Sequence, residues 1–356
     1  MGCEPAIRVW GGSGWVTETD YVMLRRFTLS GKRKGWNIHV EGGADPDAIG
    51  ATTGVVYALA VDSNGDLAFA GLSLSEDVYQ WDDSENVAWD YDHAGTIRAV
   101  VMDGSDNLYV AGTTGGGSKQ VRKFNSSGTL QWSVSLDSSP TTGRSLALDS
   151  AGKLYVGTEA TPTIAANVFQ LEPSTGSVNW SLNANSTAFH VKAAVAIAFD
   201  SNDDMYVAHA LDSPSGPVPI MKWTYNSGSK PTASSSISTT HQGNALAVDG
   251  SDNLYVAGAP DTGTSDELQK FNSSGTLQWG FAHGATLHAV HVDAAGDVWI
   301  AGEFDTTDSV DVRRLNSSGV EQSTHNYQDS NGSNPARSIL RVSDDRIYVG
   351  GNVTPA

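Results

Sequence analysis

Hydrophobic and polar positions along the chain follow a repeated phrase that predicts two short strands. The phrase is an apolar run ending in aspartate, then a turn of glycine, asparagine, serine or aspartate, then a run such as Leu-Tyr-Val-Ala-Gly. Clear copies are residues 99–112 (AVVMDGSDNLYVAG) and 245–258 (ALAVDGSDNLYVAG). Because these turn residues suit the tight connections between antiparallel strands, each copy predicts a β-hairpin.

A second phrase, Lys-Phe-Asn-Ser-Ser-Gly-Thr-Leu-Gln-Trp, alternates with the first. It occupies Lys123–Trp132 and Lys270–Trp279, and it also predicts a hairpin. Together the two phrases make a four-stranded unit that repeats every 41 to 51 residues or so, roughly the period of a propeller blade. The aromatic residues at fixed places in the phrases are expected to pack the blades.

Counting the units predicts seven blades. The chain starts with a hairpin of the second kind (Val22–Val40) and finishes with one of the first kind (Ala336–Asn352), so these two half-blades complete each other. We therefore expect an all-β, seven-bladed propeller of four-stranded antiparallel blades, closed by pairing of the N-terminal hairpin with the C-terminal hairpin. The predicted domains are an N-terminal arm, residues 1–21, and a single propeller, residues 22–356. The residues that end the first strand of each unit are Asp62, Asp103, Asp149, Asp200, Asp249, Asp293 and Ser343.

Charge and hydropathy limit the partners. The formal net charge of −19 repels phosphate backbones, so we expect no nucleic-acid partner. No apolar run approaches the ~20 residues of a membrane span, so membrane insertion is not expected. One basic patch (Arg25, Arg26, Lys32, Arg33 and Lys34) is either a solvated turn or a docking point for an acidic neighbour, which leaves self-association open.

The start of the chain bears on localisation. Residues 1–20 lack the basic start and apolar stretch of a signal peptide, and the single cysteine, Cys3, allows no internal disulfide. The acidic, lysine-poor surface rich in serine, threonine and glycine nevertheless suits a protein that works outside cells. A virus particle reconciles the two observations, so a virion is the predicted location. An extracellular or periplasmic location is the alternative.

The hairpin Leu171-Glu-Pro-Ser-Thr-Gly-Ser-Val-Asn-Trp180 resembles the repeat of pyrroloquinoline-quinone-like propellers. The Leu-Tyr-Val-Ala-Gly hairpins are similar to the repeats of seven-bladed families of the SBBP and NHL type, found in bacteria and phages. The resemblance implies the propeller fold and leaves function open, because such propellers include enzymes, scaffolds and adhesins. Quinoprotein dehydrogenases of this group also carry a vicinal cysteine pair, which this chain lacks, so no cofactor is expected.

The links between hairpins differ from blade to blade, whereas the turns within hairpins are uniform. Function is therefore expected on the face that carries the links. Three histidines, His93, His190 and His283, each lie ten residues before a strand-ending aspartate, which predicts one level around the mouth of the central channel. They are candidate binding residues, either as a metal or pH-sensitive collar or as polar groups lining a wet opening.

Trp10 and Trp15 lie outside the repeat, in a glycine-rich segment. They are candidate binding residues for a sugar or a protein partner, with packing of the arm against the propeller as the alternative. Two turns, Asp62-x-Asn64-Gly65-Asp66 and Asp200-x-Asn202-x-Asp204, space oxygens as calcium loops do, but Asx-turns explain the same residues. We expect no metal site.

No catalytic motif is present: there is no Gly-x-Ser-x-Gly, no His-Glu-x-x-His and no Walker A loop. The channel-facing strand positions read mostly as alanine, valine, leucine and isoleucine, although a pair of channel carboxylates would suit a glycosidase. The hypothesis is a non-enzymatic interaction or structural propeller of a virus particle, on a phage tail or surface, whose partners are other virion proteins or a host-surface glycan or receptor. The alternatives are a periplasmic or secreted scaffold without quinone and a glycan-active enzyme.

Overall fold

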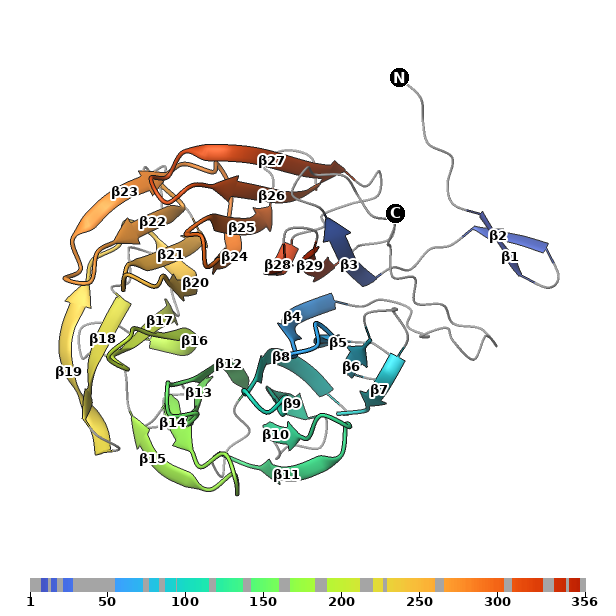
Figure 1. Ribbon diagram of the computed structural model, residues 1–356, viewed down its shortest axis with the longest axis horizontal. Helices are drawn as coiled ribbons and strands as arrows, with labels where there is room; N and C mark the ends of the chain where they lie inside the picture. Colours follow the sequence, from blue (N-terminus) through green and yellow to red (C-terminus); the bar gives the residue numbers. More distant parts are fainter. Residues whose placement is uncertain are drawn as a thin grey trace.

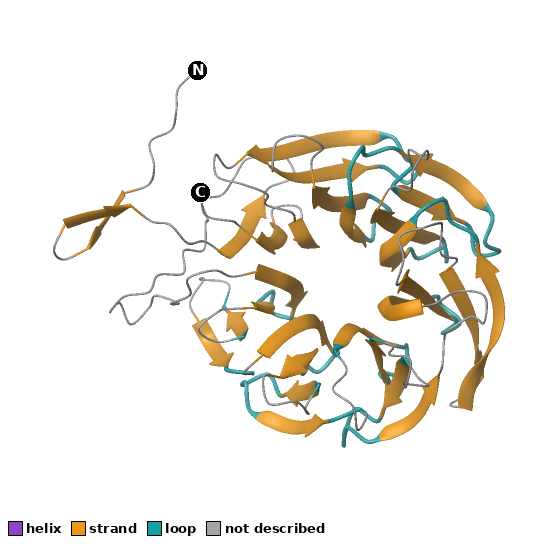
Figure 2. Ribbon diagram, turned by 180° about the vertical axis from the view of Figure 1, so that it is seen from behind, coloured by secondary structure: helices purple, strands orange, loops and turns teal. Residues whose placement is uncertain are grey.

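The protein is a ring of antiparallel blades around one axis, seen in the computed structural model (Figure 1). Strands make up the regular structure of the described residues, and none of these residues forms a helix that could cross a membrane (Figure 2). The described residues are 8–11, 14–17, 22–27, 55–72, 77–82, 87–93, 95–114, 120–136, 142–159, 167–182, 191–211, 220–226, 229–259, 266–303, 309–328, 336–343 and 346–352.

Six blades have four antiparallel strands each, numbered outward from the axis in chain order. The first three blades are β4 (Val55–Val61), β5 (Leu67–Leu72), β6 (Val78–Trp81) and β7 (Val87–Tyr91); β8 (Gly95–Met102), β9 (Leu108–Thr114), β10 (Val121–Phe124) and β11 (Leu130–Val134); and β12 (Gly143–Leu148), β13 (Leu154–Thr158), β14 (Val168–Leu171) and β15 (Val178–Leu182). The next three are β16 (Val191–Phe199), β17 (Met205–Leu211), β18 (Ile220–Asn226) and β19 (Ser229–Ile237); β20 (Gln242–Val248), β21 (Leu254–Ala259), β22 (Leu268–Phe271) and β23 (Leu277–Phe281); and β24 (Leu287–Val292), β25 (Val298–Glu303), β26 (Ser309–Leu315) and β27 (Glu321–Gln328).

Three further strands lie between the sixth and first blades (Figure 1). They are β28 (Ala336–Ser343), β29 (Arg346–Asn352) and β3 (Val22–Phe27), and β29 pairs antiparallel with both of the others. The predicted count of seven four-stranded blades is therefore not met by the described residues, which form six. The fourth strand expected here falls within residues 28–40, outside the described part. A separate hairpin joins β1 (Arg8–Gly11) to β2 (Gly14–Thr17).

The core consists of apolar layers between neighbouring blades. In the layer between the fourth and fifth blades, Tyr206, Ala208 and Ile220 pack with Leu254 and Val256, all nearly inaccessible to solvent. The second strand of each blade is buried on both faces, which explains why its sequence reads as a continuous apolar run. The aromatic residues of the repeat phrases lie in these layers, as predicted.

An aspartate at the end of the inner strand organises each turn. Asp103 accepts hydrogen bonds from the backbone amides of Ser105 and Asn107 and from the hydroxyl of Tyr109, which lies on the next strand. Asp62 accepts the amides of Asn64 and Asp66 in the same way, at 2.9 and 2.8 Å. The Asx-turn interpretation of these segments is confirmed, since their carboxylates are occupied by backbone donors.

The turns of adjacent blades are also joined to each other by a contact that we call the Ser–Asp clasp. Ser63 donates its backbone amide and its hydroxyl to the carboxylate of Asp106 in the next blade, at 2.8 and 2.7 Å. The same clasp joins Ser150 to Asp203, at 2.8 and 2.6 Å. A third joins Ser201 to Asp252.

Candidate functional site at the channel opening

Every inner strand of the described ring carries a β-bulge at the same place. In β8, Ile97 pairs with Gly112 and Ala99 with Ala111, so Arg98 between them has no partner in the ladder. A bulge re-aims the side chain of its extra residue, and here the extra residues line the central channel. The seven bulged residues, which we call the bulge ring, are Tyr57, Arg98, Arg144, Val195, Asn244, His288 and Arg337.

The glycine that ends the phrase Val-Ala-Gly belongs to this bulge. A Cβ atom on Gly112 would lie 1.9 Å from the backbone oxygen of Thr96, and one on Gly258 would lie 1.8 Å from that of Gln242. At these two bulges the strands approach so closely that a side chain does not fit. Thr158 and His209 take the corresponding position in the third and fourth blades, which keep the bulge, so the glycine is a sequence signal for the bulge in the other blades where it recurs.

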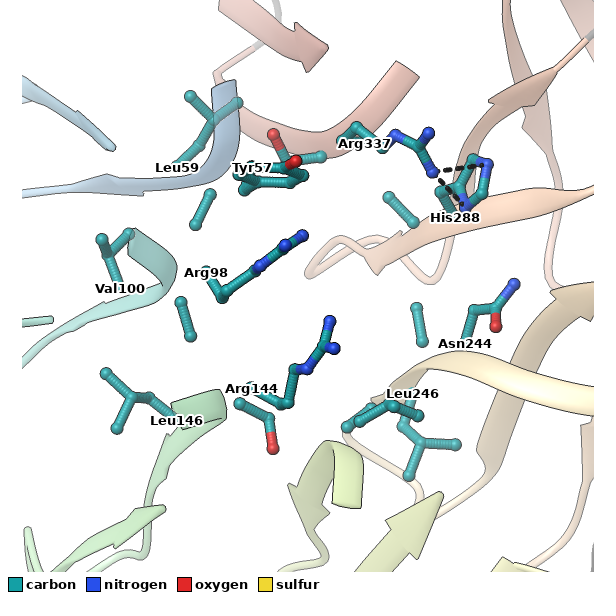
Figure 3. A pocket seen from close by; sticks show the side chains of 18 of the residues that line it. Tyr57, Leu59, Arg98, Val100, Arg144, Leu146, Asn244, Leu246, His288 and Arg337 are labelled. Atoms are coloured by element: carbon teal, nitrogen blue, oxygen red, sulfur yellow. Dashed lines mark hydrogen bonds between the residues drawn. The ribbon is translucent and has the colours of Figure 1, made fainter. Parts of the chain in front are cut away.

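The bulge ring lines a cavity of about 230 Å³ together with a second, apolar ring (Figure 3). The second ring comes from the residue two positions after each bulged residue, so it lies one step further along the channel. Its members are Leu59, Val100, Leu146, Ile197, Leu246, Val290 and Ile339.

The arginines of the bulge ring differ in their partners. Arg144 forms a salt bridge with Glu159. The guanidinium of Arg98 lies 4.3 Å from the centre of the Tyr57 ring, a cation–π contact, and its buried Nε has no hydrogen-bond acceptor in the described structure. Among the described residues, no carboxylate pairs with Arg98. Arg98 and Arg144 both point into the channel (Figure 3).

A hydrogen-bonded chain joins Glu303, His288 and Arg337. Nε2 of His288 lies 3.0 Å from Oε1 of Glu303, and because a carboxylate only accepts, Nε2 carries the proton and donates it. Nη1 of Arg337 lies 3.1 Å from Nε2 and 3.3 Å from Nδ1 of the same ring, and because Nε2 donates to Glu303, Nδ1 is the nitrogen that can accept from Arg337. The hydrogen bond from His288 holds the pKa of Glu303 below its usual value. Burial lowers the pKa of Arg337, which nevertheless remains charged at any physiological pH.

This arrangement places three guanidinium groups at one level of a protein with a formal net charge of −19. Guanidinium groups bind carboxylate and phosphate oxygens through paired, charge-assisted hydrogen bonds. One imidazole and one amide, from His288 and Asn244, add further polar groups to the ring. Chemically, the channel opening is suited to binding an anion.

The prediction that channel-facing positions are apolar is correct for the second ring and wrong for the bulge ring. A regular strand alternates its side chains, and the bulge shifts one residue out of that alternation. No aspartate or glutamate is among the described residues that line the channel, and Glu159 and Glu303, which contact the bulge ring, pair with Arg144 and His288. Within the described ranges, no three histidine, cysteine, aspartate or glutamate side chains are grouped to hold a metal ion.

The two members of the predicted histidine collar that the structure describes lie away from the channel cavity, and their binding role stays a prediction. His93 is 1% exposed and His283 is 7% exposed, and neither lines the channel. His283, in the link between the fifth and sixth blades, instead has Nε2 2.9 Å from the buried carboxylate of Asp311 on β26. His190 lies outside the described residues. The residues that line the opening come five positions later, at Arg98 and His288 for these two blades.

Trp10 and Trp15 lie opposite each other in the β1–β2 hairpin. Their side chains lie outside the described part, so their predicted binding role stays a prediction. Arg25 and Arg26 of the basic patch lie on β3, where the backbone pairs with β29. The other three residues of that patch, Lys32, Arg33 and Lys34, lie outside the described residues.

Known structures resemble the fold. The virginiamycin B lyase from Staphylococcus aureus has a TM-score of 0.60 and 11% identity, covering 93% of this chain and 100% of the lyase. A catalytically inactive variant of that lyase, with one histidine replaced by alanine, was solved with quinupristin. The WD40 propeller domain of Doa1 has a TM-score of 0.60 and 15% identity, covering 86% and 92%. BamB from Moraxella catarrhalis has a TM-score of 0.50 and 16% identity, covering 86% and 100%.

At these identities the likeness to solved structures is one of fold. A search of curated proteins finds none that matches. The comparison with protein families matches residues 25–210 and 117–287 to one family, described as outer membrane protein assembly factor BamB. These two overlapping stretches cover most of the ring. The chain therefore belongs to this BamB-like family of β-propellers.

Proposed function

We propose that this propeller is a non-enzymatic binding protein that holds the anionic group of a small ligand at the channel opening. The observation that carries the proposal is the bulge ring, with Arg98, Arg144 and Arg337 at one level of the channel. Elsewhere the repeat is uniform, so three guanidinium groups at one bulge position are a departure that the fold itself does not require.

Arg98 is the expected primary contact. Arg144 and Arg337 already have partners in Glu159 and His288, whereas the partner of Arg98 among the described residues is the ring of Tyr57. An anion that binds Arg98 would supply the acceptor that its buried Nε lacks. The negative charge of the rest of the protein lowers the affinity for an anion at long range, so binding depends on direct hydrogen bonds.

Isothermal titration calorimetry of the whole chain with acetate and with inorganic phosphate tests the proposal. We expect millimolar binding that Arg98→Ala weakens by roughly tenfold or more, because a hydrogen bond to a charged group contributes about 1.5–3 kcal/mol. Lys230→Ala is the matched control, since it removes one positive charge from the exposed face of β19, outside the channel. Binding that is absent, or equally weak in all three proteins, would contradict the proposal.

A second candidate function is acid–base catalysis at His288. Glu303 orients the imidazole through Nε2, so Nδ1 would act as the base once a bound substrate takes the place of Arg337 as its partner. The structurally similar lyase loses activity when one histidine becomes alanine. Incubation with quinupristin followed by mass spectrometry tests this candidate: a product made by the unaltered chain and not by His288→Ala would favour an enzyme over a binding protein.

We also propose that the ring closes as a seventh four-stranded blade. The pairing of β3 with β29 supports it, and residues 28–40 would supply the fourth strand. Hydrogen exchange tests this proposal, because backbone amides of residues 30–40 are then as protected as those of β7. Rapid exchange throughout that segment would leave a three-stranded end to the ring.

The wider role, as part of a virus particle with a host-surface or virion partner, remains a prediction from the sequence. Binding of the labelled protein to intact bacteria, with Trp10→Ala as the comparison variant, tests it. Saturable binding that weakens in this variant would support a receptor-binding role. The periplasmic or secreted scaffold is the alternative, and co-purification with envelope proteins would favour it.

A further inference from the structure

We propose that the ligand is an amphipathic carboxylate, whose anionic head binds the bulge ring while its apolar body lies against the second ring. The inference rests on the proposed function and names the class of ligand. It follows from the order of two chemically different rings along one channel.

The first observation is that the lining changes from mostly polar side chains in the bulge ring to apolar side chains in the second ring. Two residues of a strand span roughly 6.6 Å, so the second ring begins within reach of a ligand bound at the first. Figure 3 shows Leu59, Val100, Leu146 and Leu246 around the channel alongside the polar residues. All seven members of the second ring are leucine, valine or isoleucine, so none offers a side-chain hydrogen bond.

The second observation is the uneven distribution of groups within the bulge ring. Arg337, Tyr57, Arg98 and Arg144 come from four consecutive positions around the ring, with Arg337 beside Tyr57 across the β29–β4 junction. The opposite arc begins with Val195. Asn244 and His288, the other residues of that arc, carry no guanidinium group, so the head group binds on the side of the three arginines.

The third observation is size. An apolar cavity of roughly 150 Å³ holds benzene. The channel cavity of about 230 Å³ is larger, so it accommodates a six- to eight-carbon chain or a single aromatic ring besides the carboxylate. A sugar of that size would leave its hydroxyl groups without partners against the second ring, a loss that disfavours glycans here.

The experiment is a homologous series of straight-chain carboxylates, from acetate through butanoate and hexanoate to octanoate, titrated into the whole chain by calorimetry. Burying one methylene group strengthens binding roughly fourfold, so the dissociation constant should fall by about that factor per carbon until the cavity is filled. Arg98→Ala should weaken every member of the series by the same factor.

Val290→Thr tests the second ring independently of the bulge ring, since it replaces one methyl group of a second-ring side chain with a hydroxyl group of similar volume. It should leave acetate binding unchanged and reduce the gain per methylene. Leu246→Asn is a second variant with the same expected result. A circular dichroism melt of each variant checks that the ring is folded.

The possible outcomes separate the two proposals. Acetate binding that is sensitive to Arg98→Ala but does not strengthen with chain length would overturn the amphipathic ligand and leave the anion site standing. A series that strengthens with chain length but ignores Val290→Thr and Leu246→Asn would also overturn it, because the body would then lie elsewhere. Absence of any binding would overturn both.

Discussion

The turns that follow the inner strands and the channel opening both recur from blade to blade, but they differ in which features are repeated. At the turns, an aspartate at the strand end and its Asx-turn recur, and a Ser–Asp clasp joins three of the described pairs of blades. At the channel opening, the same bulge recurs, but it carries tyrosine, arginine, valine, asparagine or histidine. Backbone geometry repeats in both regions, and side-chain identity repeats only in the first.

The difference has a physical cause. Asp106 in the turn has a φ of 61°, which few residue types adopt, and its carboxylate accepts two hydrogen bonds from Ser63. Arg98 at the bulge has no partner in the strand ladder, and its side chain enters the channel. The fold therefore restricts the turn position to aspartate or glycine in the described blades and leaves the bulge position free. Four predictions test this contrast, from the largest expected effect to the smallest.

Gly112→Ala should break the bulge itself. Its Cβ would meet the backbone oxygen of Thr96 at 1.9 Å, and two backbone strands cannot separate locally without losing ladder hydrogen bonds. We expect a loss of about 3 kcal/mol or more in the free energy of unfolding, measured by urea denaturation. Gly104→Ala is the matched control, since a Cβ there meets nothing within 4 Å and should change stability by less than about 0.5 kcal/mol. Equal losses in the two variants would show that close approach is not what requires the glycine.

His209 occupies the same position in the fourth blade, and it should make stability depend on pH. Burial lowers its pKa from the ordinary histidine value of 6.5 to about 4, so the unfolded chain binds the proton more tightly. The contribution of neutral His209 to the free energy of unfolding is complete above pH 6.5. It is lost as the pH falls toward 4, by up to roughly 3 kcal/mol.

His209→Thr should flatten that dependence, because threonine does not titrate in this range. Threonine is chosen because Thr158 takes the corresponding position in the third blade. Urea titrations at pH 7.5 and 4.5 measure the change for each protein. Parallel losses in the two proteins would assign the acid sensitivity to other groups, such as His241 and His291, whose pKa values are also lowered by burial.

The clasp can be extended to a pair of blades that lacks it. Gly104 and Gly152 occupy the serine and aspartate positions of the second and third blades, and a Cβ at either meets nothing within 4 Å. Gly152→Asp alone should cost about 1 kcal/mol, because glycine there has a φ of 75°. Combined with Gly104→Ser it should recover about 1–2 kcal/mol through the two new hydrogen bonds. A double-mutant cycle with no coupling would mean that the clasp does not stabilise the ring.

Arg98→Ala should have the smallest effect on the fold. Its contact within the described structure is the ring of Tyr57, so the expected loss is within about 1 kcal/mol, read from a thermal melt. A loss of 2 kcal/mol or more in the free energy of unfolding would mean that the bulge ring holds the blades together. The contrast between the turns and the channel opening would then fail.

The repeat phrases predicted the blades well and the channel poorly. Residues 99–112 form β8 and β9, and Asp103 forms the expected Asx-turn, because local turn chemistry determines both. The prediction of channel-facing positions assumed that side chains alternate regularly along each inner strand. The bulge breaks this alternation, so the bulge ring was not predicted. The pairing of His288 with Glu303 and Arg337 was missed because it joins three strands that are distant in sequence. The repeated glycine of Val-Ala-Gly, represented by Gly112, was the available clue.

The pairing of β3 with β29 has a consequence for synthesis of the protein. These strands lie side by side, but roughly 320 residues separate them in the chain, and a ribosome adds about 5–20 residues per second. The backbone edge of β3 therefore waits on the order of 15 to 65 seconds for its partner. During that interval it can pair with strands of other chains, so crowded expression at high temperature is the condition under which this ring should be hardest to complete.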